Sequence, residues 1–219
     1  MPKNTFFNLP EDKRMRILDA SIAEFAAHPY KVASIANIVR QAKIAKSSYY
    51  QYFEDKQDLY RYLIQLCTEE RLALLKTLPT PDPASDLFGY LRWLLLSAVY
   101  FEVQRPRLAT ITYRAFVEEI PFPEMIEELR RRGTTQFFKQ LLAQGILHGT
   151  VSPMVDPDMA AFLLESIYYR VGKYVLERVR SDDGELNEKT ALEDESVQQL
   201  LDNLMDLIKG GMQDKSPQR

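Results

Sequence analysis

Apolar residues recur at helical spacing along most of this chain. Ile17 and Phe25 lie on one face of a predicted helix over residues 10–27, which begins at a proline and is ended by a His-Pro pair. A shorter helix follows Ser34, a favourable N-cap residue, and another begins near Ala45. The pattern therefore predicts three short helices in the first fifty or so residues.

The same spacing continues beyond residue 54. A long helix over residues 55–76 leads to the segment LPTPDPAS, whose prolines cannot continue it and indicate a linker. The chain has only eight glycines among its 219 residues, which favours helices over a many-turned β architecture. We therefore predict an all-α fold, with one domain over residues 1–54 and a second over 55–219. Further helices are expected at residues 84–103, 106–119, 123–144, 157–180 and 194–210.

The content of reactive side chains narrows the classes of function. Cys67 is the single cysteine, and only two histidines are present, so we expect no disulfide, no metal site and no cofactor. No Ser/His/Asp order or phosphate-binding loop is visible, so no catalytic residues are predicted and an enzyme is disfavoured. The N-terminus lacks a secretory pattern and no apolar run reaches membrane-spanning length, so we expect a cytoplasmic protein.

Charge is distributed unevenly along the chain. Residues 1–60 contain nine Lys or Arg and seven Asp or Glu, a net charge of +2, whereas the whole chain carries -3. The remainder is therefore acidic. A basic N-terminal part suits a protein that contacts phosphate groups at one end only.

Residues 30–59, YKVASIANIVRQAKIAKSSYYQYFEDKQDL, hold a specific succession of residue types. An aromatic residue precedes a Ser-Ile pair that opens a helix, and an alanine precedes a turn. A short helix then ends in Tyr-x-Tyr-Phe, and a lysine starts the next one. This succession resembles the DNA-binding signature of the TetR family. The matching residues are Tyr30, Ser34-Ile35, Ile38-Val39, Ala42, Tyr50, Tyr52-Phe53 and Lys56.

The resemblance implies a helix-turn-helix whose recognition helix, near residues 45–51, enters the major groove of DNA. Ile44, Tyr49 and Phe53 are expected to face the small core, which leaves the polar side chains outward for base edges and phosphates. By resemblance, Lys46, Ser47 and Ser48 read bases or the nearby backbone, Tyr50 and Tyr52 contact phosphates and groove walls, and Ser34 and Lys56 each bind a phosphate.

Two positions depart from the family pattern. Lys43 stands at the turn position that is usually glycine, and Ser47 replaces the usual glycine of the recognition helix. If the turn requires a positive φ, Lys43 adopts it at a modest energetic cost. The second change alters contacts to bases or phosphates.

The region beyond residue 60 matches no pattern that identifies a ligand. It is rich in aromatic side chains, which either fill a core or line an apolar pocket between helices. The candidate ligand-binding residues are Trp93, Tyr100, Tyr113, Phe116, Phe137, Tyr168 and Tyr169. The resemblance implies that the last two helices form a dimer interface, for which the apolar stripes offer Phe162, Ile167, Val171, Leu200, Leu204 and Leu207.

These observations favour a transcriptional repressor. A homodimer would bind double-stranded DNA at a pseudo-palindromic operator, and an apolar or amphipathic effector would move the two recognition helices away from the one-turn spacing of about 34–36 Å. The continuous helix that begins near residue 55 would link the two sites. An activator, or a constitutive DNA binder without an effector, is the alternative with the same DNA chemistry. An enzyme is a remote alternative.

Overall fold

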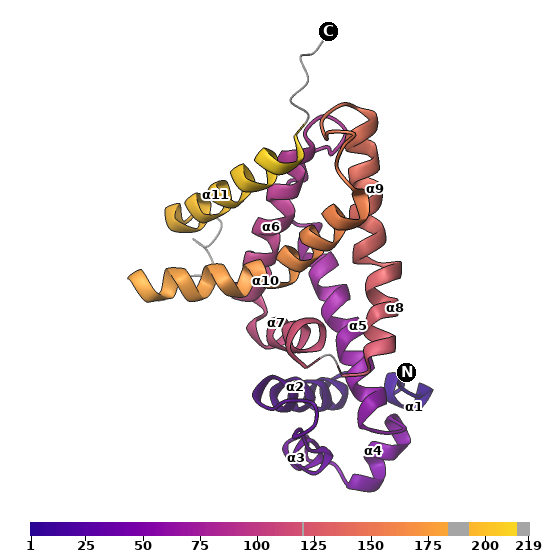
Figure 1. Ribbon diagram of the computed structural model, residues 1–219. Coiled ribbons are helices and arrows are strands. Elements are labelled where there is room, and N and C mark those ends of the chain that lie inside the picture. Colours follow the sequence, from indigo (N-terminus) through magenta and orange to yellow (C-terminus); the bar gives the residue numbers. More distant parts are fainter. Residues whose placement is uncertain (120, 184–192, 214–219) are drawn as a thin grey trace. The chain divides into compact units, whose positions relative to one another are not determined.

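The computed structural model describes residues 1–119, 121–183 and 193–213 (Figure 1). The described chain is helical apart from turns and an isolated antiparallel pairing of Val151 with Gln213, so the all-α prediction is confirmed. The elements are α1 (Asn4–Phe7), α2 (Glu11–Ala27), α3 (Ile35–Gln41), α4 (Lys46–Tyr52), α5 (Lys56–Leu75), α6 (Leu87–Gln104), α7 (Pro106–Tyr113), the π-helix η1 (Arg114–Glu118), α8 (Pro123–Arg132), α9 (Thr134–Leu147), α10 (Pro157–Asp183) and α11 (Glu195–Met212).

Most predicted helices begin and end within a few residues of the observed ones, because their end signals are local. Pro106 stands at the first position of α7, where its missing N–H costs no hydrogen bond. The carboxylate of Asp194 accepts the N–H groups of Ser196 and Val197 at 3.0 and 3.1 Å, so it caps α11.

One expectation about the helices is wrong, and one helix was not expected. The helix predicted over 123–144 is two helices, because Gly133 has φ -103° and ψ -98°, far from helical values, and separates α8 from α9. The sequence also did not predict α1, a four-residue helix. Only Phe6 of α1 is buried, which is too little for a periodic signal.

The chain divides into two compact units. Unit 1 contains Met1–Ala73 and Arg105–Pro121, and unit 2 contains Leu74–Gln104 and the chain from Phe122 onward. The chain therefore passes three times between the units, and α7 with η1 folds with the N-terminal helices. The boundary predicted after residue 54 lies just before α5, and it stays a prediction.

The core of unit 1 consists of large side chains from sequence-distant helices. Ile17 of α2, Ile38 of α3, Tyr49 of α4 and Leu63 of α5 are fully buried, and Ile111 of α7 joins them. Burial of each such side chain stabilises the fold by about 1.5–3 kcal/mol. The short helices are too short to be stable alone, so this shared core holds them.

Unit 2 is organised around α6. This helix is apolar on most sides and packs against α10 and α11, while α9 packs against α10. Gly172 of α10 allows a close approach to α6, since a Cβ there would lie 2.7 Å from the backbone oxygen of Ala98. Arg92 of α6 pairs with Asp202 of α11 at 2.7 Å.

Candidate functional site

The turn between α3 and α4 has the geometry that a helix-turn-helix needs. Lys43 has φ 54°, so the turn does place a positive φ at this non-glycine position. The N–H of Ile44 donates to the oxygen of Val39 at 3.0 Å, and Ala42 is fully buried beneath the turn. The left-handed conformation costs about 1–2 kcal/mol for a residue with a Cβ. The buried apolar side chains on both sides of the turn compensate for it.

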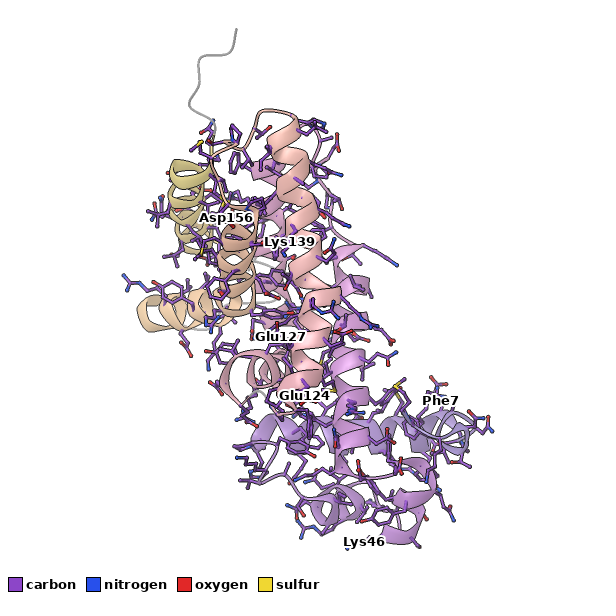
Figure 2. All side chains as sticks on the ribbon, turned by 45° about the vertical axis from the view of Figure 1, so that its right-hand side comes forward. Phe7, Lys46, Glu124, Glu127, Lys139 and Asp156 are labelled. Atoms are coloured by element: carbon purple, nitrogen blue, oxygen red, sulfur yellow. The ribbon has the colours of Figure 1, made fainter. Side chains whose placement is uncertain are left out.

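Helix α4 has one buried and one exposed face. Tyr49 is fully buried, as is Phe53 just after the helix, which confirms their predicted core positions. The Tyr49 hydroxyl donates to the oxygen of Asp55 at 2.9 Å, and burial raises its pKa. Lys46 lies on the outer side of unit 1 in Figure 2. The exposed or half-buried residues are the predicted Lys46, Ser47, Ser48 and Tyr50.

Tyr52 is an exception, because the prediction that it faces outward is wrong. Its side chain is 5% exposed and packs near Phe6, with the Lys13 ammonium 5.7 Å from its ring. The cause is α1. Lys3 donates its N–H to the oxygen of Tyr52 at 2.8 Å, and Thr5 donates its hydroxyl to the oxygen of Gln51. The N-terminal residues thereby cap the C-terminus of α4, which the family signature gave no means of predicting.

The segment between α2 and α3, residues 28–34, is called the connector here. Ser34 occupies the N-cap position of α3, as predicted, but its hydroxyl makes no cap hydrogen bond. Its N–H instead donates to the buried carboxylate of Glu24 at 2.8 Å, and Asn37 donates to the same oxygen at 3.3 Å. Glu24, a residue that the sequence analysis did not single out, therefore fixes the start of α3.

Lys56 lies at the start of α5 and binds the connector. Its ammonium donates to the oxygens of Tyr30 at 2.7 Å, Ala33 at 3.0 Å and Lys31 at 3.4 Å. It also lies 4.6 Å from the centre of the Tyr30 ring. A lysine has three N–H donors, so these contacts use all of them. Lys56 would have to release a connector carbonyl before it bound a phosphate.

The seven candidate ligand-binding residues are divided between the units. Tyr113 and Phe116 belong to unit 1, and the other five belong to unit 2. Within unit 2 a chain of ring contacts joins α6, α9 and α10. Its members are Tyr90, Trp93, Phe137, Phe138, Tyr168 and Tyr169.

Polar groups accompany these rings. Among the described residues, the Trp93 indole N–H and one carboxylate oxygen of Glu165 are buried without a hydrogen-bond partner. Thr135 donates to the other oxygen of Glu165 at 3.0 Å, and burial raises the pKa of this carboxyl. Glu165 was missed because it belongs to no motif in the sequence of α10.

An open groove lies between the N-terminal half of α10 and the C-terminal half of α11. Its volume is about 930 Å³, and its lining includes Met159, Leu163, Ile167, Leu204 and Leu207. Of the predicted interface residues, Leu207 is 76% and Phe162 60% exposed, whereas Ile167, Leu200 and Leu204 are partly buried. Val171 is 5% exposed and belongs to the core of unit 2, so it presents no free surface to a partner.

Two models of known protein families match the N-terminal and the C-terminal parts of the chain. Residues 17–63 match the family "Bacterial regulatory proteins, tetR family", and residues 85–213, more than half of the chain, match "Tetracyclin repressor-like, C-terminal domain". Among the described residues, none of the helices has both the length and the hydrophobicity to cross a bilayer.

Individual relatives agree with these matches. A TetR family transcriptional regulator from Chloroflexus aurantiacus is 39% identical, with 97% of this chain and 99% of that chain covered and a TM-score of 0.79. The HTH-type transcriptional regulator YhgD of Bacillus subtilis is 20% identical over 72% of this chain and 81% of that protein. The regulator FadR of Bacillus subtilis, solved in complex with stearoyl-CoA, shares the fold at 18% identity, with coverage of 90% and 98% and a TM-score of 0.64. The chain belongs to the TetR family of DNA-binding transcriptional regulators.

Proposed function

We propose that this regulator is a repressor that binds a pseudo-palindromic duplex as a homodimer and is released by an apolar or amphipathic small molecule. The observation that carries the proposal is that α4 has one buried apolar face and one exposed polar face. Tyr49 and Phe53 anchor the helix to the core, while Lys46, Ser47 and Tyr50 are exposed in front of it. A recognition helix needs this combination of a rigid back and a donor-rich front.

The exposed cations near α4 support binding to DNA. Arg40 at the end of α3, Lys43 in the turn and Lys46 are all exposed. Each cation that neutralises a phosphate releases counterions, so the affinity for DNA should fall steeply with salt. Arg40 and Lys43 were not among the predicted site residues, and they extend the proposed DNA-binding surface.

A homodimer is proposed because a pseudo-palindrome requires two recognition helices one helical turn apart. The exposed apolar side chains of the α10–α11 groove, among them Met159 and Leu163, are typical of a surface that another protein covers.

The substitution Leu207→Glu tests this interface. Residue 207 is exposed in the single protomer, so the glutamate should not disturb its folding, but in the dimer the carboxylate would be buried. We therefore expect this variant to sediment as a monomer. The matched control is Leu72→Glu on α5, also at an exposed leucine, which should stay dimeric.

The effector is proposed to bind unit 2 near Trp93 and Glu165. Apolar rings with a few unpartnered polar atoms suit a ligand that has an apolar body and a polar group. Stearoyl-CoA, the molecule bound to the Bacillus subtilis FadR, is an amphipathic compound of this kind and is the first one to test.

The experiment begins with a duplex that the wild-type protein selects from a randomised DNA library. Its affinity is measured by fluorescence anisotropy with and without stearoyl-CoA and a panel of other amphipathic compounds. Release by a compound supports the effector role, and the same duplex must then weaken binding of that compound by the same factor. An affinity that no compound changes would favour a constitutive binder, and increased transcription from the selected site would favour an activator.

Trp93→Ala tests where the effector binds. This variant should change the affinity for a releasing compound and leave DNA binding in its absence nearly unchanged. An unchanged affinity for the compound would place the effector elsewhere.

A further inference from the structure

The connector is bound by charged side chains from three separate parts of the chain. Glu24 of α2 accepts the N–H of Ser34, and Lys56 of α5 donates to three connector carbonyls. The third is Glu119, which accepts the N–H of Tyr30 from 89 positions further along the chain, while its partner Arg114 binds the adjacent end of α2. The family signature ends near residue 60, so no part of it includes this pair.

Arg114 caps the C-terminus of α2. The last carbonyls of a helix have no partner within it, and a cation near them is favourable. Helix α2 has no basic residue in its own last turn. The Arg114 guanidinium supplies the charge, since it donates to the oxygens of Phe25 and Ala26 at 3.1 and 2.9 Å.

Glu119 binds the connector that follows the end of α2. Its carboxylate accepts the N–H of Tyr30 at 2.7 Å and pairs with Arg114 at 3.7 Å. Both charged side chains are about 20% exposed, so solvent screens the contacts only partly. Arg114 thus binds the last carbonyls of α2, and Glu119 binds an N–H of the connector.

The π-helix makes this arrangement possible. In an α-helix, side chains five positions apart point in directions about 140° apart. The N–H of Glu119, the residue just after η1, donates to the oxygen of Arg114 at 2.8 Å, so residue 119 lies one π-helical turn after residue 114. The extra residue in the turn brings the two side chains to one side.

We propose that Arg114 and Glu119 are positioning residues for DNA recognition: they hold the α2 terminus and the connector, and thereby set the position of α3 and α4. This inference rests on the proposed DNA-binding function. The segment that supplies them, residues 105–121, belongs to unit 1, but its neighbours along the chain on both sides belong to unit 2. The recognition helix is therefore positioned partly by residues outside the DNA-binding signature.

The test compares Arg114→Met with Arg105→Met. Arg105 pairs with Glu70 at 3.1 Å in the same unit, but this contact does not involve the connector. For Arg114→Met we expect about a tenfold loss of affinity for the selected duplex, equivalent to one charge-assisted hydrogen bond. The slope of affinity against salt should not change, because no phosphate contact is lost. Amide hydrogen exchange should become faster at residues 30–33, and the control should show neither effect.

Glu119 provides a second variant series. Glu119→Gln keeps an acceptor for the Tyr30 N–H and should retain more affinity than Glu119→Ala. Wild-type affinity of folded Arg114→Met, equal losses in the control, or a salt slope reduced by about one unit would each overturn the positioning role. Failure of the wild-type chain to select any duplex would refute the DNA-binding proposal itself, and this is seen before a variant is made. Unchanged hydrogen exchange in the connector would refute only the positioning role.

Discussion

Replacement of Lys56 by methionine separates two roles for this side chain. The family resemblance assigns it to a phosphate of the DNA, whereas its ammonium contacts three carbonyls of the connector. Methionine has a similar length and no charge, so Lys56→Met removes the donors while it retains much of the apolar packing. We expect this variant to lose stability even when DNA is absent.

The magnitude follows from the geometry. The hydrogen bonds to Tyr30 and Ala33, at 2.7 and 3.0 Å, are partly buried, and the third, to Lys31, is long and exposed. Hydrogen bonds to charged groups contribute about 1.5–3 kcal/mol each when buried, and an exposed cation–π contact about 0.5–1 kcal/mol. Because water can rehydrate the connector carbonyls, we expect a net loss of about 2 kcal/mol in the free energy of unfolding.

The assay is urea unfolding followed by far-ultraviolet circular dichroism, together with the salt dependence of binding to the selected duplex. Lys31→Met is the matched control, because Lys31 is an exposed lysine in the same connector. It should leave the unfolding midpoint unchanged. Lys56→Met should lower the midpoint, and the folded variant should keep the wild-type salt slope.

The opposite pattern would refute the reasoning. If Lys56→Met unfolds with a free energy within about 0.5 kcal/mol of wild type and its salt slope falls by about one unit, Lys56 binds phosphate and its connector contacts contribute little.

Three further predictions concern other residues. Lys43→Gly should raise the free energy of unfolding by up to about 1 kcal/mol, because it removes the cost of a left-handed conformation at φ 54°, and a loss of stability in urea would contradict this. Burial raises the pKa of Glu165, so its contribution to stability is present at acid pH and is lost as pH rises through that raised value. Glu165→Gln should therefore be more stable than wild type near neutral pH and equal to it near pH 4, as thermal unfolding across pH would show. Burial raises the pKa of Cys67 to about 12, so iodoacetamide should label this thiol only on unfolding, and labelling of the native protein at the rate of a free thiol would refute its buried position.

Much of the candidate DNA-binding surface could be predicted from local pattern. Tyr49 and Phe53 fall on the apolar side of a short helix, and their burial follows from spacing alone. Lys43 occupies a turn whose geometry requires a positive φ whatever the residue. The burial of Tyr52 could not be predicted in this way, because it depends on packing against α1. That helix lies about forty positions earlier in the chain.

The sequence by itself determined the helical periods, most helix ends and the two-sided character of α4, since these depend on residues within one or two turns of each other. Tertiary structure decided which backbone groups each charged side chain binds. Lys56 lies 26 positions from the Tyr30 carbonyl that it binds, and Arg114 lies 89 positions from Phe25. Such pairings leave no periodic trace, because a single cation can bind any carbonyl that folding brings within reach. The path of residues 105–121 back into unit 1 is likewise set by the burial of side chains such as Ile111, not by a local signal.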